Sequence, residues 1–112
     1  MEFKTRDALE LWRTTLVEGV RARGPDLSAR QLALLLTVYL SAPPHTVRGL
    51  AAGLKVSKPA ITRALDRLGQ LGLLRRKRDE ADKRNVLVER TVKGSVFLND
   101  LGERIAAAGR AL

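Results

Sequence analysis

Residues 46–91 read TVRGLAAGLKVSKPAITRALDRLGQLGLLRRKRDEADKRNVLVERT. The pattern in this stretch predicts a helix, a tight turn, a second helix and then a basic β-hairpin. This order is typical of a winged helix-turn-helix, in which the first helix supports the second and the hairpin forms the wing. We therefore predict a mainly α fold with a small β-hairpin wing, organised as a winged helix-turn-helix in a single domain over residues 1–112.

Both helices of this stretch have recognisable start signals. Thr46 is placed to cap a helix over 47–54, and Ser57 is placed to cap a second helix over 58–71. Residues 55–56 form the turn between them. The second helix has Pro59 in its first turn, where the missing N–H removes no intrahelical hydrogen bond. Its expected buried face consists of Ile61, Ala64, Leu65 and Leu68.

The opposite face of the second helix carries a varied set of polar groups. Hydroxyl, guanidinium, carboxylate and amide groups are the kinds that read base edges in a DNA major groove. For any one residue, a plain solvated surface is the alternative, although such a face would more often alternate Glu and Lys. The residues of this face are Pro59, Thr62, Arg63, Asp66 and Gln70, flanked by Lys58 and Arg67.

The hairpin follows directly after Gly72, which ends the second helix. We predict strands over 73–77 and 85–89, with 78–84 as the tip. Asp79 and Asp82 are the turn formers, because Asp side chains accept hydrogen bonds from nearby backbone amides.

Positive charge is concentrated on the same stretch. The chain has 21 Lys and Arg against 12 Asp and Glu, a net charge of +9. Residues 55–84 hold ten basic and four acidic side chains, so about a quarter of the chain carries +6 of that excess. A solvated basic surface is one explanation, but on a winged-helix scaffold the charge favours double-stranded DNA as the partner.

Composition also argues against several classes of protein. The chain has no cysteine, which excludes disulfides and thiolate metal sites, and it has a single histidine, His45, which we expect in surface or loop packing. We expect no metal and no cofactor. An enzyme is not expected either, because no nucleophile has a plausible base beside it. The sequence has no membrane-length apolar run and no signal peptide, so we expect a soluble, cytoplasmic protein.

Three further helices surround the central stretch. The helix expected over 28–41 begins with a capping box of Ser28 and Gln31. Its apolar run predicts a central, buried position, and residues 42–45 should form a short rigid loop.

The two outer helices, 5–23 and 92–110, are candidates for dimerisation. Thr91 is placed to cap the second of them. Each has an apolar stripe at helical spacing, so one stripe can cover the core while the other faces a second copy. The alternative is that both pack only within one chain. The residues predicted at the interface are Leu9, Trp12, Leu16, Leu98, Leu101 and Ile105.

Three motifs in this order resemble the MarR family of bacterial winged-helix transcriptional regulators. LSARQLALL resembles the family's helix-opening Leu-Ser/Thr-x-x-Gln segment, and LAAGLKVSKPAITRALDRLGQLGLL resembles its helix-turn-helix. RDEADKRNVLVERTVKG resembles its wing signature, Asp-x-x-Asp-x-Arg followed by Thr-x-x-Gly. Together they cover residues 27–94.

The resemblance implies a homodimer on a pseudo-palindromic operator, usually as a repressor. It places Ser57, Lys58, Pro59, Thr62 and Arg63 in the major groove. Arg84 becomes the wing arginine that enters the minor groove, and Asp82 the acid that braces the wing. Strand and tip cations would contact phosphates. The full set predicted to contact DNA is Thr46, Ser57, Lys58, Pro59, Thr62, Arg63, Arg67, Arg76, Arg78, Lys83 and Arg84.

The sequence departs from the family pattern in several places. Family members usually run longer, with an additional helical segment that completes an interleaved dimer. Of the features that the resemblance implies, the dimer geometry is therefore the one least supported by this sequence. Lys55 stands where a turn glycine is common, and 89–90 replace a common hydrophobic residue.

Many relatives bind small aromatic acids, and such a ligand could contact Trp12, Arg13 and Tyr39. We expect Trp12 and Tyr39 mainly as core residues. Two other functions stay open: a winged helix of a plasmid or phage replication or partition protein, and a winged helix that contacts other proteins.

Overall fold

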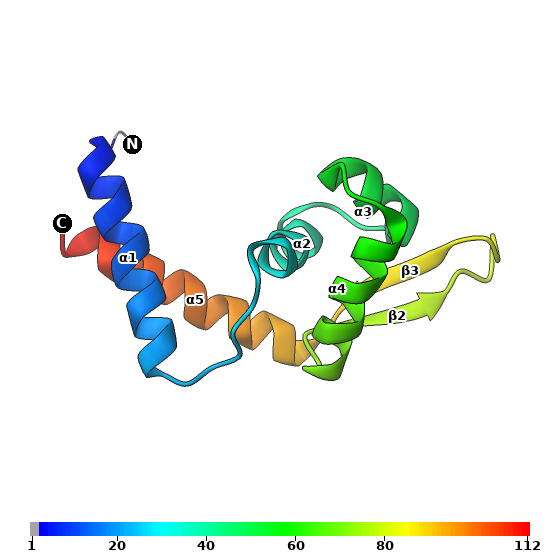
Figure 1. Ribbon diagram of the computed structural model, residues 1–112. Coiled ribbons are helices and arrows are strands. Elements are labelled where there is room, and N and C mark those ends of the chain that lie inside the picture. The colour runs from blue at the N-terminus through cyan, green and yellow to red at the C-terminus, as the bar shows by residue number, and fades with distance from the viewer. Residues whose placement is uncertain (1–2) are drawn as a thin grey trace. The chain divides into compact units, whose positions relative to one another are not determined.

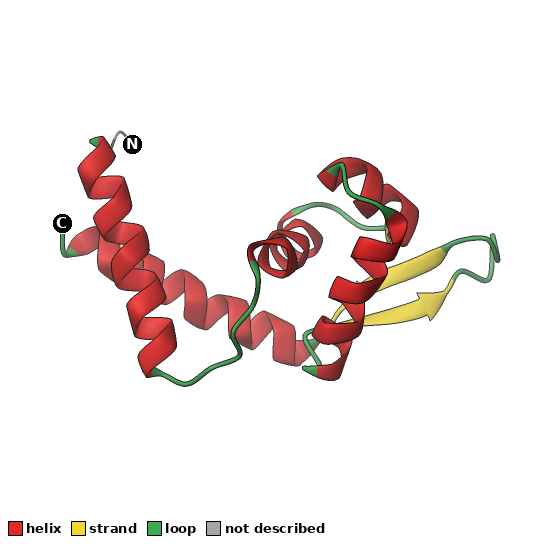
Figure 2. Ribbon diagram, viewed as in Figure 1, coloured by secondary structure: helices red, strands yellow, loops and turns green. Residues whose placement is uncertain are grey.

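The computed structural model describes residues 3–112 and is mainly helical, with one small sheet (Figures 1 and 2). This content of helix and strand matches the predicted fold class. In chain order the elements are α1 (Thr5–Arg21), α2 (Ala29–Leu40), β1 (His45–Thr46), α3 (Val47–Leu54), α4 (Lys58–Gln70), β2 (Leu74–Arg78), β3 (Val86–Arg90) and α5 (Val92–Arg110).

The chain divides into two compact units. One consists of Leu27–Val96, and the other of the residues up to Asp26 together with Phe97–Leu112. Helix α5 begins in the first unit and ends in the second. The organisation as one domain over residues 1–112 stays a prediction, and the two units are described separately.

The core of the Leu27–Val96 unit lies between α2, α4 and the sheet. Leu34, Leu35 and Val38 of α2 are fully buried, and the predicted inner face of α4 (Ile61, Ala64, Leu65 and Leu68) is buried as well. Each fully buried Leu or Ile side chain contributes about 1.5–3 kcal/mol relative to exposure. The predicted central, buried position of α2 agrees with these three residues, although Leu40 at its C-terminal end is 81% exposed.

Side-chain caps fix where the helices of this unit begin. Thr46 Oγ1 accepts a hydrogen bond from Gly49 N at 2.9 Å, and Ser57 Oγ accepts one from Ala60 N at 3.2 Å. The predicted capping box of Ser28 and Gln31 is present at the start of α2. Lys55 ends α3 with φ +56°, a left-handed conformation that few non-glycine residues adopt.

The sheet has three strands, not the two of the predicted hairpin. Its order is β1-β3-β2, and all pairs are antiparallel. The predicted loop over 42–45 is therefore corrected: His45 and Thr46 pair with Val88 and Leu87. Both main strands also begin and end one residue later than predicted. The tip is closed by Asn85, which exchanges backbone hydrogen bonds with Asp79 and Asp82 and so does not join β3.

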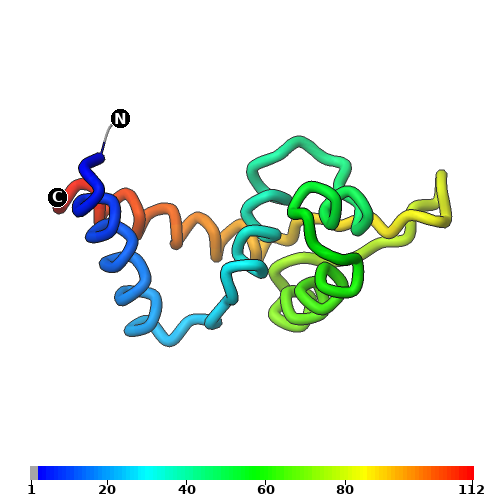
Figure 3. Tube along the Cα trace, turned by 45° about the horizontal axis from the view of Figure 1, so that its top comes forward, coloured from blue at the N-terminus to red at the C-terminus, as the bar shows by residue number. Residues whose placement is uncertain are grey.

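The hairpin of β2, β3 and residues 79–85, called the wing below, extends beyond the helices of its unit in two views (Figures 1 and 3). Its base is tightly packed. Thr91 Oγ1 accepts from Gly94 N at 2.9 Å, which confirms the predicted cap of α5, and donates to Gly72 O at 2.7 Å. Gly94 has no room for a side chain, because a Cβ atom there would overlap the Tyr39 hydroxyl and the Leu73 carbonyl oxygen.

The second unit consists of α1 and the C-terminal part of α5. Thr15 and Ala108 are buried in it, and Leu11 lies next to Gly109. The apolar stripe of α1 remains uncovered: Leu9, Leu16 and Val20 are exposed, and Trp12 is 41% exposed. The expectation that Trp12 belongs to the core is therefore wrong for this chain.

Candidate nucleic-acid interface

The polar face of α4 is exposed as the sequence predicts. Lys58, Pro59, Arg63, Asp66, Arg67 and Gln70 are exposed and Thr62 is half-buried. Helical periodicity alone places these side chains opposite the buried positions, because the apolar residues recur every three or four positions.

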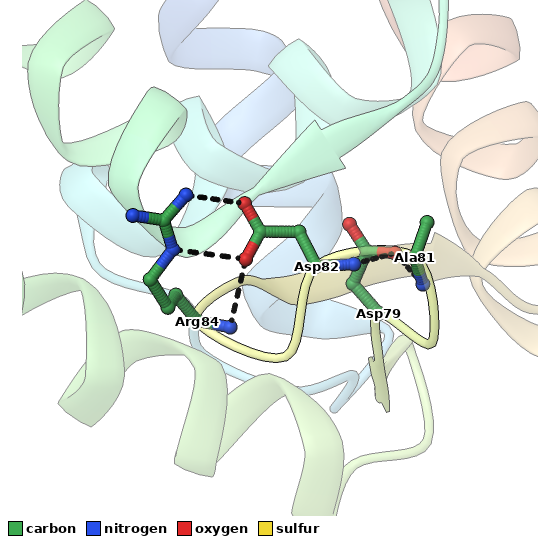
Figure 4. Close-up of polar contacts among 4 residues, drawn as sticks. All are labelled: Asp79, Ala81, Asp82 and Arg84. Carbon is green, nitrogen blue, oxygen red and sulfur yellow. Dashed lines mark hydrogen bonds and ion pairs between the residues drawn. The ribbon is translucent and has the colours of Figure 1, made fainter.

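The wing tip is organised by two aspartates (Figure 4). Asp79 Oδ1 accepts from the backbone amides of Ala81 and Asp82, at 3.0 and 3.3 Å. Asp82 accepts from the Arg84 side chain through both carboxylate oxygens, at 3.0 Å each, and from the Arg84 backbone amide at 3.1 Å. The Arg84 guanidinium is thereby held in one orientation while remaining exposed.

These contacts shift the acidity of the pair. The hydrogen bonds from the Arg84 side chain, and then from its backbone, lower the pKa of Asp82, and a smaller contribution comes from the positive charge of Arg48. The Asp82 carboxylate in turn raises the pKa of Arg84. Both groups therefore stay ionised over a wide pH range.

A groove between the start of α4 and the wing brings several predicted residues together. Lys58, Thr62, Arg76 and Arg84 line it, although they are up to 26 positions apart in the sequence. Arg48 of α3 and Asn85 of the tip line it too, and neither was predicted. Arg48 could have been found, because it is a basic residue in the first turn of the supporting helix. Four of the lining residues are cationic and none is acidic, which favours a negatively charged partner.

Besides the pair of Arg84 and Asp82, two ion pairs modify this positive surface. Asp66 of α4 pairs with Arg76 of β2 at 2.6 Å, and Glu89 of β3 pairs with Arg75 at 3.1 Å. The remaining cations of α4 and the wing form no ion pair with any residue of the described chain. They are Lys58, Arg63, Arg67, Lys77, Arg78, Lys83 and Arg90.

Other predicted features lie apart from this groove. Within residues 3–112, no three His, Cys, Asp or Glu side chains gather where a metal ion could be held. Of the side chains considered for an aromatic ligand, Arg13 is paired with Glu10 at 2.6 Å, and the Tyr39 hydroxyl is hydrogen-bonded to backbone groups. The ligand stays a prediction. No helix of the described chain combines the length and apolarity that crossing a bilayer requires.

Comparison with known proteins agrees with this geometry. The model of the MarR family matches residues 27–86, more than half of the chain. The chain belongs to the MarR family. The matched region contains α2, α3, α4 and most of the wing, and the groove is lined by residues of α3, α4 and the wing.

One relative of this MarR-family chain is a bacterial transcriptional regulator. It is 33% identical over 79 residues to the HTH-type transcriptional regulator PecS of Dickeya dadantii, covering 69% of this chain and 48% of PecS. The chain thus spans about half the length of that relative.

A cysteine-to-serine mutant of MarR from E. coli, complexed with operator DNA, superimposes with a TM-score of 0.70 at 26% identity. The match covers 94% of this chain and 69% of that one. A mutant of MepR from S. aureus has the same fold, with a TM-score of 0.77 at 17% identity over 98% and 82% of the two chains. The predicted winged-helix fold is therefore confirmed.

Proposed function

We propose that this chain is a sequence-specific, double-stranded DNA-binding transcriptional regulator that acts as a homodimer, in most settings as a repressor. The observation that carries the proposal is the groove lined by Arg48, Lys58, Thr62, Arg76 and Arg84 between α4 and the wing. A helix with an exposed polar face beside a cationic hairpin provides both base-reading groups and phosphate-binding groups. The family membership of residues 27–86 supports the same conclusion.

In this proposal α4 enters the major groove. Thr62 and Arg63 face the base edges, and a bidentate arginine contact to guanine is the commonest specific contact of this kind. Lys58 and Pro59 lie at the same end of the helix, and Arg67 is two turns further along, where the DNA backbone passes. Thr46 and Ser57 contribute mainly by fixing the helix starts, because their hydroxyl oxygens are already used as caps.

The wing contributes the second set of contacts. Arg84, held by Asp82, is oriented before binding, so less conformational entropy is lost when it enters a narrow minor groove. Arg78 and Lys83 contact phosphates, which adds affinity without sequence information. Arg76 faces the DNA backbone as well, but its charge is paired with Asp66.

A second copy of the chain covers the exposed stripe of α1. Leu9, Leu16 and Val20 are exposed large apolar residues on one helix, and Trp12 lies on the same stripe. Contiguous apolar surface of this kind marks an interaction site. Leu98, Leu101 and Ile105 on α5 are half-buried and complete the proposed interface. A symmetric dimer doubles the DNA site and explains repression, because a bound dimer in the bacterial cytoplasm blocks access to a promoter.

Sequencing the genomic fragments that the purified protein retains at physiological salt tests this proposal. We expect an inverted repeat upstream of genes, with half-sites about one helical turn apart. Retained sites confined to replication or partition loci would replace promoter control with that alternative. Retention without any motif would contradict sequence-specific binding and favour a protein partner.

A variant series makes the test specific to α4. Arg63→Ala should weaken binding to the recovered site by about 1–3 kcal/mol and relax the preference at one base pair of each half-site. Arg110→Ala, which removes the same charge from the end of α5, is the matched control and should leave the preference unchanged. An identical preference in the Arg63 variant would remove this residue from base recognition.

A further inference from the structure

One hydroxyl group lies where the two main strands of the wing begin and end. Tyr39 Oη is 3.0 Å from the carbonyl oxygens of Leu73 and Thr91, and it accepts a hydrogen bond from the Thr91 amide, also at 3.0 Å. Leu73 directly precedes β2, and Thr91 directly follows β3. A single side chain of α2 therefore connects both ends of the hairpin at its base, opposite the tip.

Arg90, the last residue of β3, makes a second connection to the same helix. Its Nε donates to Val38 O at 3.1 Å, its Nη2 donates to Ser41 O at 3.0 Å, and its guanidinium carbon lies 5.7 Å from the centroid of the Tyr39 ring. Carbonyl groups at the C-terminal end of a helix have no intrahelical partner and carry partial negative charge. The planar fork of arginine can satisfy two of them at once, which a lysine ammonium group cannot do in the same geometry.

The surrounding packing leaves this arrangement little freedom. Gly94 lies against the Tyr39 hydroxyl and the Leu73 carbonyl so closely that no Cβ atom fits. His45 Nε2 also lies 3.2 Å from Ser41 O, the carbonyl that Arg90 binds. Neither Tyr39 nor Arg90 lines the groove between α4 and the wing. The groove therefore gives no reason to expect that either residue contacts the DNA.

Small changes at the base of a hairpin become large at its tip. A five-residue strand is about 17 Å long, so a tilt of roughly 10° at the base moves the far end by about 3 Å. A hydrogen bond or ion contact does not survive a displacement of that size.

We infer that Tyr39 and Arg90 are positioning residues that hold the base of the wing against the C-terminal end of α2, and thereby place Arg84 and the wing cations for DNA contact. The inference rests on the proposed DNA-binding function. It assigns a role to two residues outside the groove, and it explains why an arginine occupies the last position of β3 where a hydrophobic side chain would only pack.

Two variants test the inference, each with a matched control. Tyr39→Phe removes only the hydroxyl, and Thr37→Val removes a hydroxyl of the same helix that donates locally to Ala33 O. Arg90→Met removes the guanidinium from the end of β3. Its control, Arg30→Met, removes the same charge from the first turn of α2. Amide hydrogen exchange, measured without DNA, reports on the hydrogen bonds at the base of the wing. Binding to the duplex recovered from genomic selection reports on the DNA contacts of the wing.

Exchange separates local positioning from global stability. In Tyr39→Phe, we expect the Thr91 amide to exchange at least tenfold faster relative to the Val88 amide in the middle of β3, because its acceptor is gone. Thr37→Val should leave this ratio unchanged. An unchanged ratio in Tyr39→Phe would overturn the role of the hydroxyl.

The salt dependence of DNA binding tests the consequence for the wing. Each phosphate contact contributes about 0.9 to the slope of log K against log salt. We expect Arg90→Met to reduce the magnitude of this slope by about two, whereas Arg30→Met should leave it within about 0.5. Equal slopes would overturn the positioning role of Arg90. A wild-type protein that binds no DNA overturns the proposed function. The exchange ratio still decides whether the Tyr39 hydroxyl holds the base of the wing.

Discussion

Neutralising Asp66 should strengthen binding to non-specific DNA. Asp66 is the one acid on the exposed face of α4, and its carboxylate pairs with Arg76 at 2.6 Å beside the groove. The two side chains are 53% and 38% exposed, so the pair contributes no more than about 1 kcal/mol to folding. Asp66→Asn keeps the shape but frees the charge of Arg76 for a phosphate. One added phosphate contact changes the salt slope by about 0.9, which at about 0.15 M salt corresponds to roughly fivefold tighter binding.

Fluorescence anisotropy with a random-sequence duplex, repeated over a series of salt concentrations, measures both quantities. Glu89→Gln is the matched control, because it also removes one negative charge and frees Arg75, a neighbour of Arg76 that points to the opposite face of the hairpin. We expect little change of slope in the control. Unchanged affinity and slope in Asp66→Asn would refute the idea that Arg76 faces the DNA backbone.

Three further outcomes are expected. Gly94→Ala should lower the free energy of unfolding by about 3 kcal/mol in urea denaturation, because its Cβ overlaps two oxygen atoms, whereas Gly102→Ala, in open space, should not destabilise the protein. Leu101→Glu should yield a monomer by light scattering, and a dimeric mass would remove the α5 seam from the interface. Arg84→Met should raise the pKa of Asp82 in a carboxyl ¹³C titration, since Arg84 lowers it; an equal midpoint would contradict the pairing.

The pH dependence that follows from this pairing has a definite sign. Because the pKa of Asp82 is lowered in the folded chain, its contribution to stability is present above the pKa of the unfolded carboxyl group and is lost as the pH falls through the folded pKa. The orientation of Arg84 should therefore persist at neutral pH and loosen only in acid. Because Asp82 stays ionised between pH 6 and 8, its titration should not change DNA binding over that range.

Local signals explain why most helices could be predicted from the sequence. A capping hydroxyl lies within three residues of the amide it binds. Thr46, Ser57 and Thr91 therefore mark the starts of their helices without tertiary information. The buried face of α4 was predictable for a similar reason, since the spacing of its apolar residues follows the helical period.

Contacts between distant segments explain what the sequence did not predict. β1 consists of only two residues, and its pairing with Val88 depends on the position of a strand more than 40 residues away. The contact of Arg90 with α2 spans 52 residues, and no local pattern indicates it. The groove itself was predicted only in part, because the approach of Arg48 to the wing depends on how α3 packs.

Methylation protection on the recovered DNA site tests the central claim most directly. Dimethyl sulfate modifies guanine N7 in the major groove and adenine N3 in the minor groove, so one reaction reports on both α4 and the wing. We predict a protected guanine in each half-site that becomes reactive again in Arg63→Ala, and protected flanking adenines that become reactive again in Arg84→Ala. A site bound tightly by the wild-type protein with neither kind of protection would contradict a recognition helix in the major groove and a wing arginine in the minor groove.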